Sequence, residues 1–330
     1  MKLRTRGLAL GVAMTAIALS ACSSNGASTS TNSGAAGQNA SLTVGFDNPL
    51  GYTNNMPVLI AIDQGYFAKN GLDVKTVAFN SGSDATKALA SGSIQVQSGV
   101  GFDAVGAQAK SVDAKGFYGI SKKSDFVFYA NPTIATSFKD LNGRKVAISA
   151  FGSYTDFLTR QIAASQGWDP KAITEVALGT VPTYAAAVAK GDVAGVWNPA
   201  SLAGVFKGAN NIGTLDDLGV PSQYSTLIAM NDYINANQDV LRRFTEAIKR
   251  AIAWHAANRD AAIALAVKEL KLTQPAAESA YDIAKGIYVP DGAMNIDGFK
   301  RMADSVPDLQ LGPKAPAVTD IYSTKITGGS

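Results

Sequence analysis

The sequence predicts an α/β fold built from two similar units, and three observations lead to this prediction. The chain has 330 residues, a length that suits two domains or one divided structure at roughly 100–200 residues per domain. From residue 42 onward, short apolar runs typical of strands alternate with helical stretches. The alternation starts again near residue 140, which indicates a second α/β unit.

The elements of the first unit follow from the apolar runs and from the residues that bound them. Pro57 suits the first turn of a helix, where a missing N–H has no partner to lose, and Gly65 and Gly92 suit left-handed helix ends. Alternation of this kind predicts a parallel sheet covered by helices. The expected strands are 42–46, 72–79, 94–100 and 116–120, and the expected helices are 57–64, 84–90 and 102–110.

The second unit is followed by a helical C-terminal third, which commonly packs back on an earlier part of the fold. A strand is expected at 224–230, between the second unit and these helices. In the second unit we expect strands 145–149, 175–178 and 193–197 and helices 154–166, 183–190 and 199–207. The long helices are expected at 238–257, 260–270, 275–286 and 295–306.

The N-terminus predicts a lipid-anchored tether. Lys2, Arg4 and Arg6 precede an apolar run at 7–19, which is too short to span a bilayer. The run ends in LSAC (19–22), which resembles the lipobox of bacterial lipoproteins. The resemblance implies a signal peptide at 1–21, diacylglycerol on Cys22 and a place on the extracytoplasmic face of the cell membrane. Residues 23–41 hold only small or polar side chains, so 22–41 is expected to be a flexible tether. The alternative is a secreted protein in which Cys22 is removed or idle.

Composition excludes several classes of function. Without the three leader cations, 26 Lys and Arg residues balance 26 Asp and Glu residues, so nothing indicates nucleic-acid binding. A single Cys excludes an internal disulfide and a multi-cysteine metal site. The single histidine, His255, cannot form a paired-histidine site, and its mid-helix position, remote from the loops discussed below, indicates a structural role. We therefore expect no metal and no cofactor.

Residues 60–74, IAIDQGYFAKNGLDV, resemble the A-x-x-x-G-Y-F-x-x-x-G-L-x-V signature of the periplasmic solute-binding proteins of nitrate, sulfonate, taurine and thiamine-precursor importers. ALASG (88–92), DLNGRKVA (140–147) and VWNP (196–199) extend the resemblance, whereas Gln95 stands where the family often has Asp. The resemblance implies the two-lobed type II periplasmic-binding-protein fold, with a hinge and a ligand cleft. We place one lobe at 42–122 and 226–330, the other at 123–225, and the hinge crossings at 120–129 and 223–228. Tyr66 and Phe67 are expected to fill the core beneath the sheet.

Candidate ligand-binding residues lie in loops at the carboxyl ends of the expected strands, where helix N-termini offer free N–H groups. Gly152, Ser153 and Thr155 combine close backbone approach with two hydroxyls, although Ser153 could simply cap its helix. Trp197 could cover an organic ligand or pack between the lobes. The full set is Tyr52, Asn54, Asn55, Ser81, Gly101, Phe102, Gly152, Ser153, Tyr154, Thr155, Thr183, Trp197 and Asn198.

The charges of these loops bear on the ligand. They hold Asp47, Asp84, Asp103 and Asp156 but no Lys or Arg. Helix dipoles can hold an anion unaided, and Asp84 and Asp156 could simply favour their helix starts. An amine, amidine or pyrimidine-like nitrogen would nevertheless find a partner here. The loops therefore favour a zwitterion or a polar organic heterocycle over a bare anion such as nitrate.

Taken together, the sequence predicts a monomeric binding protein that delivers a small solute to the permease and ATPase of an ABC importer. The solute is expected to resemble a sulfonate, taurine or a pyrimidine precursor of thiamine. One alternative is an enzyme of the pyrimidine-synthase type, although no Cys follows residue 22 and no His lies near the loops, so no catalytic residue is expected. Another alternative is a lipoprotein that senses its ligand for a signalling partner.

Overall fold

The computed structural model describes residues 39–327. The predicted signal peptide, Cys22 and residues 22–38 of the predicted tether lie outside the described residues. Strand β1 (Ala40–Phe46) includes the last two residues assigned to the tether, because Ala40 already pairs with Leu72 of the neighbouring strand. Between residues 39 and 327, no helix has both the length and the apolar character needed to cross a bilayer.

The first sheet has the strand order β2-β1-β3-β10-β4. Strand β1 runs parallel to β2 and β3, whereas β10 runs antiparallel to both β3 and β4. The sheet is therefore mixed, and the prediction of a parallel sheet is corrected at β10, which enters from the second sheet with no preceding crossover helix. The other strands are β2 (Leu72–Ala78), β3 (Val96–Val100), β4 (Ala114–Gly119) and β10 (Ser225–Met230).

The second sheet repeats this plan with the order β7-β6-β8-β5-β9. Strand β6 runs parallel to β7 and β8, and β5, the first strand after the chain leaves the first sheet, is antiparallel to β8 and β9. Neither β5 nor β9 is among the strands expected from the sequence. The strands are β5 (Phe126–Ala130), β6 (Lys145–Ile148), β7 (Thr174–Ala177), β8 (Gly195–Pro199) and β9 (Asn210–Thr214).

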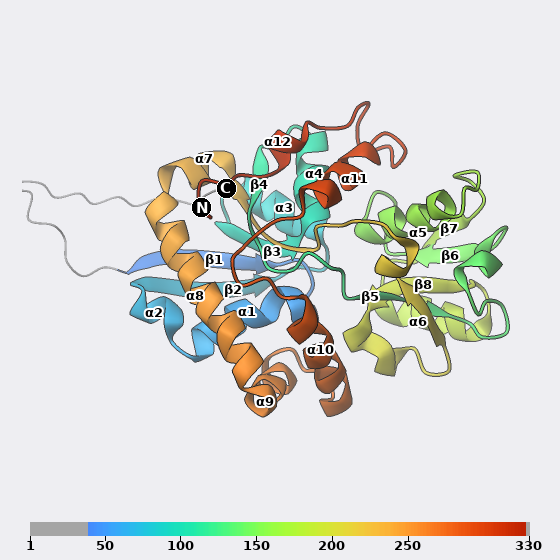
Figure 1. Ribbon diagram of the computed structural model, residues 1–330, viewed down its shortest axis with the longest axis horizontal. Helices are drawn as coiled ribbons and strands as arrows, with labels where there is room; N and C mark the ends of the chain where they lie inside the picture. Colours follow the sequence, from blue (N-terminus) through green and yellow to red (C-terminus); the bar gives the residue numbers. More distant parts are fainter. Residues whose placement is uncertain (1–38, 328–330) are drawn as a thin grey trace, which may run out of the picture. The chain divides into compact units, whose positions relative to one another are not determined.

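Helices cover both sheets, with the long helix α8 lying across the first (Figure 1). The α-helices are α1 (Tyr52–Asp63), α2 (Tyr66–Lys69), α3 (Gly82–Ala90), α4 (Gly101–Ala109), α5 (Tyr154–Ser165), α6 (Val181–Lys190), α7 (Asn231–Ala236), α8 (Gln238–Ala257), α9 (Arg259–Glu269), α10 (Gln274–Ile287), α11 (Ile296–Asp304) and α12 (Val318–Ile321). Short 3₁₀ turns are η1 (Phe138–Leu141), η2 (Ala200–Val205), which replaces the helix expected at 199–207, and η3 (Asp216–Leu218).

Glycine and proline set several helix ends, though not all as predicted. Gly65, at φ 65°, and Gly92, at φ 76°, adopt the expected left-handed conformation. Pro57 does not begin α1, because the helix starts five residues earlier at Tyr52. Residues 52–55 therefore form the first turn of α1 instead of a loop, and they lie near the carboxyl end of β1.

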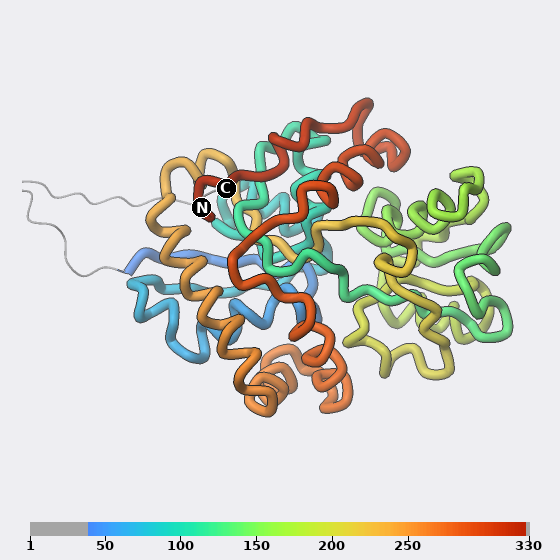
Figure 2. Tube along the Cα trace, viewed as in Figure 1, coloured from blue at the N-terminus to red at the C-terminus, as the bar shows by residue number. Residues whose placement is uncertain are grey.

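The chain passes between the sheets twice, and Figure 2 traces both passages. The first crossing is the segment 120–125 between β4 and β5, shorter than expected because β5 already begins at Phe126. The second crossing is the segment 215–224 between β9 and β10. The two are hydrogen-bonded to each other, since Gln223 Nε2 donates to the carbonyl of Ser121 at 3.0 Å.

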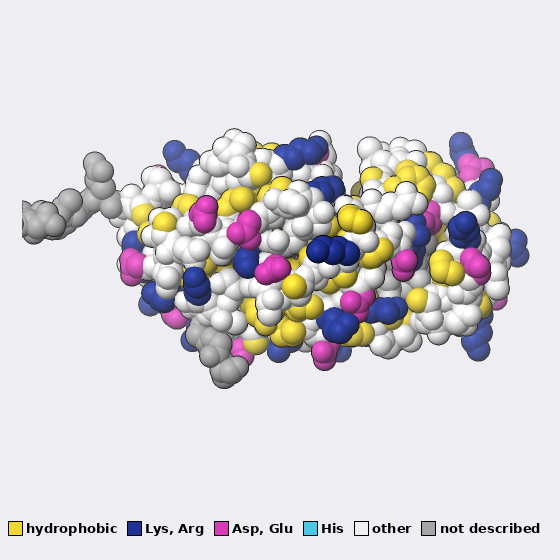
Figure 3. All heavy atoms as spheres, turned by 90° about the horizontal axis from the view of Figure 1, so that it is seen from above, with side chains coloured by type: hydrophobic (Ala, Val, Ile, Leu, Met, Phe, Trp, Pro, Cys, Tyr) yellow, Lys and Arg dark blue, Asp and Glu magenta, His cyan; other side chains and the backbone are white. Residues whose placement is uncertain are grey.

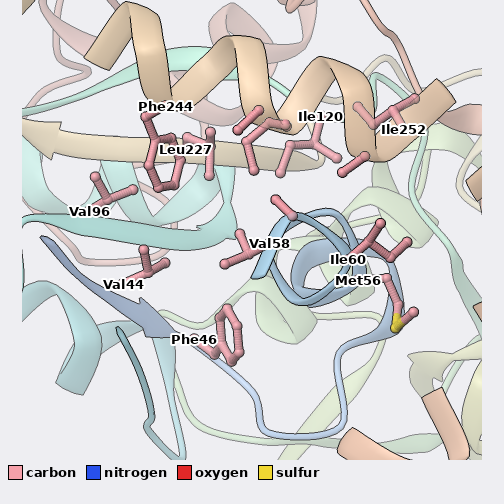
Figure 4. Packing of buried hydrophobic residues seen from close by; sticks show 14 of the residues in the cluster. Val44, Phe46, Met56, Val58, Ile60, Val96, Ile120, Leu227, Phe244 and Ile252 are labelled. Atoms are coloured by element: carbon pink, nitrogen blue, oxygen red, sulfur yellow. The ribbon is translucent and has the colours of Figure 1, made fainter. Parts of the chain in front are cut away.

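Hydrophobic packing joins these elements into one compact unit. One cluster lies between the first sheet and helices α1 and α8–α10 (Figure 4). Phe67 belongs to it, stacking on Phe244 with ring centroids 4.7 Å apart, so its predicted place in the core is confirmed. A second cluster unites α4 and α11 with α5 and one face of the second sheet, and a third covers that sheet's other face.

Candidate functional site

Three aspartates lie where the first sheet meets the two crossings. Asp47 directly follows β1, Asp103 lies in the first turn of α4 after β3, and Asp125 ends the first crossing. Asp47 is 8% and Asp125 6% exposed, whereas Asp103 is half-buried. We call Asp47, Asp103 and Asp125 the acidic site.

The first turn of α1 provides neutral donors to two of these carboxylates. Thr53 Oγ1 donates to Asp125 Oδ2 at 2.6 Å. Asn54 Nδ2 donates to Asp47 Oδ1 at 3.2 Å. Two adjacent residues of one helical turn therefore link the end of β1 to the first crossing.

Asp103 is held by the strand that precedes it. Its Oδ2 accepts from Gln97 Nε2 at 2.8 Å and from the N–H of Val100 at 3.3 Å, so it also caps α4. A Cβ placed on Gly99 would lie 2.6 Å from Asp103 Oδ2 and 3.2 Å from Asp47 Oδ2. Both carboxylates thus flank one point above the backbone of Gly99, in space that a side chain there would occupy.

Burial and mutual repulsion favour the protonated forms of these acids. Burial raises the pKa of Asp47 to about 7; the Asn54 hydrogen bond opposes this rise and the charge of Asp125 adds to it. Burial, and then the charge of Asp47, raises the pKa of Asp103 well above its usual value. Burial also raises the pKa of Asp125, against the hydrogen bond from Thr53. A positive charge beside these carboxyl groups would favour their ionised forms and oppose this rise in pKa.

Four aromatic rings from both sheets and the second crossing form a connected group next to Asp125, and we call them the aromatic wall: Phe102, Phe126, Tyr154 and Tyr224. The ring centroids of Tyr154 lie 6.2 Å from Phe102, 5.4 Å from Phe126 and 5.9 Å from Tyr224. Burial, and then the charge of Asp125, raises the pKa of Tyr224. The wall therefore joins α4 of the first sheet to α5 of the second.

Three hydroxyls gather at the start of α5, and we call Ser149, Ser153 and Thr155 the hydroxyl triad. Ser149 Oγ lies 3.0 Å from both Ser153 Oγ and Thr155 Oγ1, and the last two are 2.9 Å apart. Ser153 Oγ also accepts from the N–H of Asp156 at 3.3 Å, so the predicted cap is present. Tyr154 of the aromatic wall stands between two triad residues in sequence.

A buried ion pair fixes this turn. Asp156 Oδ2 accepts from the N–H of Gly152 at 2.6 Å, where Gly152 adopts φ 74°. Asp156 Oδ1 accepts from Arg160 Nε at 2.7 Å, and Arg160 also pairs with Glu175 at 3.0 Å. Asp156 therefore has a structural role, which removes it from the charges that a ligand could meet.

Several predicted site residues lie near the acidic site. Asn54 holds Asp47, while Phe102 and Tyr154 belong to the aromatic wall. The N–H of Gly101 donates to the carbonyl of Tyr224 at 2.7 Å, joining α4 to the second crossing. Ser81 caps α3 by accepting from the N–H of Asp84 at 3.2 Å, and it adjoins Gly82, above which the Asp103 carboxylate lies in close contact.

Other predicted residues point elsewhere. Tyr52 is fully buried, and its hydroxyl lies 3.0 Å from Nε2 of His255 on α8, so it belongs to the core. The same contact corrects the view that His255 is remote from every predicted loop. Asn55 Nδ2 donates to the carbonyl of Asn48 at 2.8 Å and stabilises the turn before α1. Thr183 lines a hollow of about 450 Å³ between α6 and strands β6 and β7, and no acidic-site residue lines it.

Trp197 lies in the core of the second sheet. Its indole is fully buried, stacks on Phe138 with centroids 5.6 Å apart, and meets the edge of Phe128 at 5.3 Å. Both contacts come from its own side of the molecule, whereas the alternative placed the ring between the lobes, and its role toward a ligand stays a prediction. Asn198 is also buried, beside Tyr184 of α6.

Sequence reasoning missed Thr53, Asp125, Tyr224 and Ser149 as candidates. Ser149 directly follows a strand that was predicted correctly, so the strand-end rule could have found it. Asp125 and Tyr224 lie at the two predicted crossings, where the topology alone brings them to the border between the sheets.

A second hollow, of about 410 Å³, is lined by Lys115, Tyr322 and Lys325 among others and includes no acidic-site residue.

Comparisons with known proteins place the chain in a family. The family model described as NMT1/THI5 like matches residues 52–262, more than half of the chain. A Brucella abortus protein named "Putative binding protein" is 24% identical over 287 residues, covering 81% of this chain and 87% of that protein.

Solved structures share the fold. The periplasmic aliphatic sulphonate binding protein SsuA from Escherichia coli has a TM-score of 0.72 at 22% identity, covering 86% of this chain and 92% of that one. The periplasmic nitrate-binding protein NrtA from Synechocystis PCC 6803 has a TM-score of 0.66 at 15% identity, covering 87% of each chain. The chain therefore belongs to the NMT1/THI5-like family and has the two-sheet fold of the periplasmic binding proteins of sulfonate and nitrate ABC importers.

Proposed function

We propose that the protein is the solute-binding component of an ABC importer and captures a small polar organic solute between its two sheets. One observation carries this proposal: groups from both sheets and both crossings converge on one place. Thr53 and Phe102 come from the first sheet's side, Tyr154 from the second, and Asp125 and Tyr224 from the crossings. A ligand bound there touches every part that would move in closure.

In this proposal, residues 42–122 and 226–330 form one lobe and residues 123–225 the other. The crossings 120–125 and 215–224 act as the hinge. Bending at these two segments would part the packing of α4 and α11 against α5, so ligand contacts with both lobes would stabilise the closed state. The closed state is what the permease and its ATPase would recognise.

We further propose that the protein works as a monomer on the extracytoplasmic face of the cell membrane, held by lipid on Cys22. Two or three acyl chains anchor a protein firmly, at about 0.8 kcal/mol per buried methylene. Figure 3 shows basic and acidic side chains scattered over the face in view, and the balanced charge beyond the leader agrees with a partner other than nucleic acid.

We propose binding without chemistry, which the resemblance to binding proteins supports. Incubation with pyridoxal phosphate gives a direct check on the pyrimidine-synthase alternative. We expect no Schiff-base absorption, and its appearance would favour an enzyme.

The solute can be identified by native mass spectrometry of the purified protein, followed by titration with alkanesulfonates, taurine, nitrate and aminopyrimidines. We expect one class to bind in a 1:1 ratio and to change the small-angle scattering of the protein as the lobes close. Tight binding with unchanged scattering would contradict capture by closure.

A matched pair of variants tests the hydroxyl triad. Ser153→Ala removes a triad hydroxyl and should weaken solute binding by about 1–3 kcal/mol. Ser165→Ala, at the other end of α5, removes a bond from its hydroxyl to the carbonyl of Ile162 and a long bond from Gln166 Nε2, and it should leave the affinity unchanged. If Ser153→Ala bound the solute as tightly as the Ser165→Ala control, the hydroxyl triad would not be part of the binding site.

A further inference from the structure

The three carboxylates of the acidic site lie together without a compensating cation. None of the ion pairs formed between residues 39 and 327 includes Asp47, Asp103 or Asp125. Their hydrogen-bond donors are hydroxyls, side-chain amides and backbone N–H groups, all neutral. Buried carboxylates normally have a charged partner or coordinate a metal, so this arrangement needs an explanation beyond packing.

Capping accounts for only part of it. Asp103 caps α4, but a cap at a helix start functions without two further buried acids beside it. Asp47 and Asp125 begin no helix, and each raises the cost of ionising its neighbours. Asparagine at either position could accept the same hydrogen bonds without that cost. The charge itself is therefore the property that a structural role leaves unexplained.

A second, independent observation is a pair of acceptors that lack donors. Asn54 Oδ1 and Asp125 Oδ1 are buried and have no hydrogen-bond partner within 3.5 Å among the described residues, although the Tyr224 hydroxyl acts on the Asp125 carboxylate as a weaker donor than Thr53. The side-chain amide of Asn54 is held at the acidic site, because its Nδ2 donates to Asp47. Its Oδ1, on the opposite side of the same amide group, is the atom without a donor. Both unsatisfied atoms accept, so the missing partner is a hydrogen-bond donor. A charged N–H group is the donor that a carboxylate binds most strongly.

The aromatic wall supplies the third element. Phe126 directly follows Asp125, and Tyr224 lies close enough for its pKa to be raised by that carboxylate. Aromatic faces attract cations that sit within about 6 Å of the ring centre, and the attraction grows when water is excluded. A basic group between Asp125 and these rings would satisfy both.

We infer that the acidic site and the aromatic wall bind the protonated nitrogen of an organic solute, such as a primary amine, an amidine or an aminopyrimidine. This inference rests on the proposed function and specifies its ligand class. The nitrogen donates to Asp125 Oδ1 and Asn54 Oδ1, and Asp47 and Asp103 balance its charge. A solute whose only charge is negative would instead approach three carboxylates that form no ion pair with any Lys or Arg between residues 39 and 327.

Paired probes that differ only in the nitrogen test this assignment. We would titrate the protein with taurine against ethanesulfonate, 4-aminopyrimidine against pyrimidine, and benzylamine against benzyl alcohol, using calorimetry and thermal shift. We expect at least one amino member to bind at least tenfold more tightly than its partner. Equal or tighter binding of the partners, or no binding by any amino probe, would overturn the inference.

Charge-neutralising variants locate the effect. Asp125→Asn keeps the size and shape of the side chain but removes its charge. It should weaken binding of the amino probe at least tenfold and leave the affinity for the matched probe without the amine unchanged. Asp103→Asn gives a second reading should Asp125→Asn fold poorly, as judged by circular dichroism. Asp84→Asn is the matched control, because Asp84 is an exposed acid that pairs with Lys87 on α3. Loss of affinity in Asp84→Asn equal to that in the site variants would contradict the assignment.

The two proposals can fail separately. A neutral or anionic solute that binds 1:1 and closes the lobes would leave the proposed function standing and overturn only the cationic ligand class. Absence of any copurified or titrated solute, with scattering unchanged throughout, would overturn both.

Discussion

Asp47→Asn should change how the stability of the ligand-free protein depends on pH. A group whose pKa rises on folding binds more protons in the folded than in the unfolded state, so it costs stability as pH increases through that interval. The pKa of Asp47 rises from 3.8 to about 7. The native protein should therefore lose stability from this carboxyl between about pH 4 and pH 7, and the variant should not.

The size of the effect follows from the shift. At 1.36 kcal/mol per pKa unit, the full interval corresponds to about 4 kcal/mol, shared with Asp103 and Asp125 because the three repel one another. His255 acts with the opposite sign: burial lowers its pKa to about 4, so the protein loses stability as pH falls from about 6.5 towards 4. Only the difference between variant and native protein isolates Asp47, since His255 is common to both.

Chemical denaturation at a series of pH values between 4 and 8 provides the assay. The free energy of unfolding of Asp47→Asn, relative to the native protein, should increase with pH by up to about 4 kcal/mol. Asp84→Asn serves as the control, because the hydrogen bond from Lys87 lowers the pKa of this exposed acid and it titrates below the interval. A difference between Asp47→Asn and the native protein that stays constant with pH would refute the reasoning.

Three further substitutions test parts of the structure beyond the acidic site. Trp197→Ala should cost about 3–5 kcal/mol of stability through the cavity that it leaves, and denaturation should show this, whereas a stable variant with weakened binding would support a ligand role. Asp156→Ala should cost about 1–3 kcal/mol, because the Gly152 N–H loses its acceptor and Arg160 keeps only Glu175 as a partner; denaturation should show this, and an unchanged free energy of unfolding would contradict the structural role of Asp156. Tyr52→Phe should cost about 1 kcal/mol by removing the hydroxyl bonded to His255 without altering solute affinity, and a changed affinity would return this ring to the site.

Local sequence patterns were sufficient for most helices and strands. Helix α8 has the predicted bounds, because an apolar stripe and charged flanks repeat along 20 residues. Strand direction could not be read in the same way, since β5 and β10 follow chain crossings instead of crossover helices. Strand β8 is buried along its whole length, so no alternation revealed which side of it Trp197 would occupy.

The candidate site was harder to predict, because its groups meet across long stretches of chain. Thr53 and Asp125 are 72 residues apart yet joined by one hydrogen bond. Asp47 and Asp103 stood out as loop charges, but only the fold shows that they are neighbours. Asp125 follows two lysines in sequence and resembles an ordinary solvated residue until the crossing buries it.

The position of β10 has a consequence for the order in which the protein can assemble. All five strands of the second sheet come from one continuous stretch, residues 126–214. The first sheet instead receives its penultimate strand from residues 225–230, which must enter between β3 and β4. During synthesis the amino end emerges first, so the second sheet can form completely once residue 214 has emerged. The first sheet still lacks β10 at that point, so the sheet that begins first is completed last.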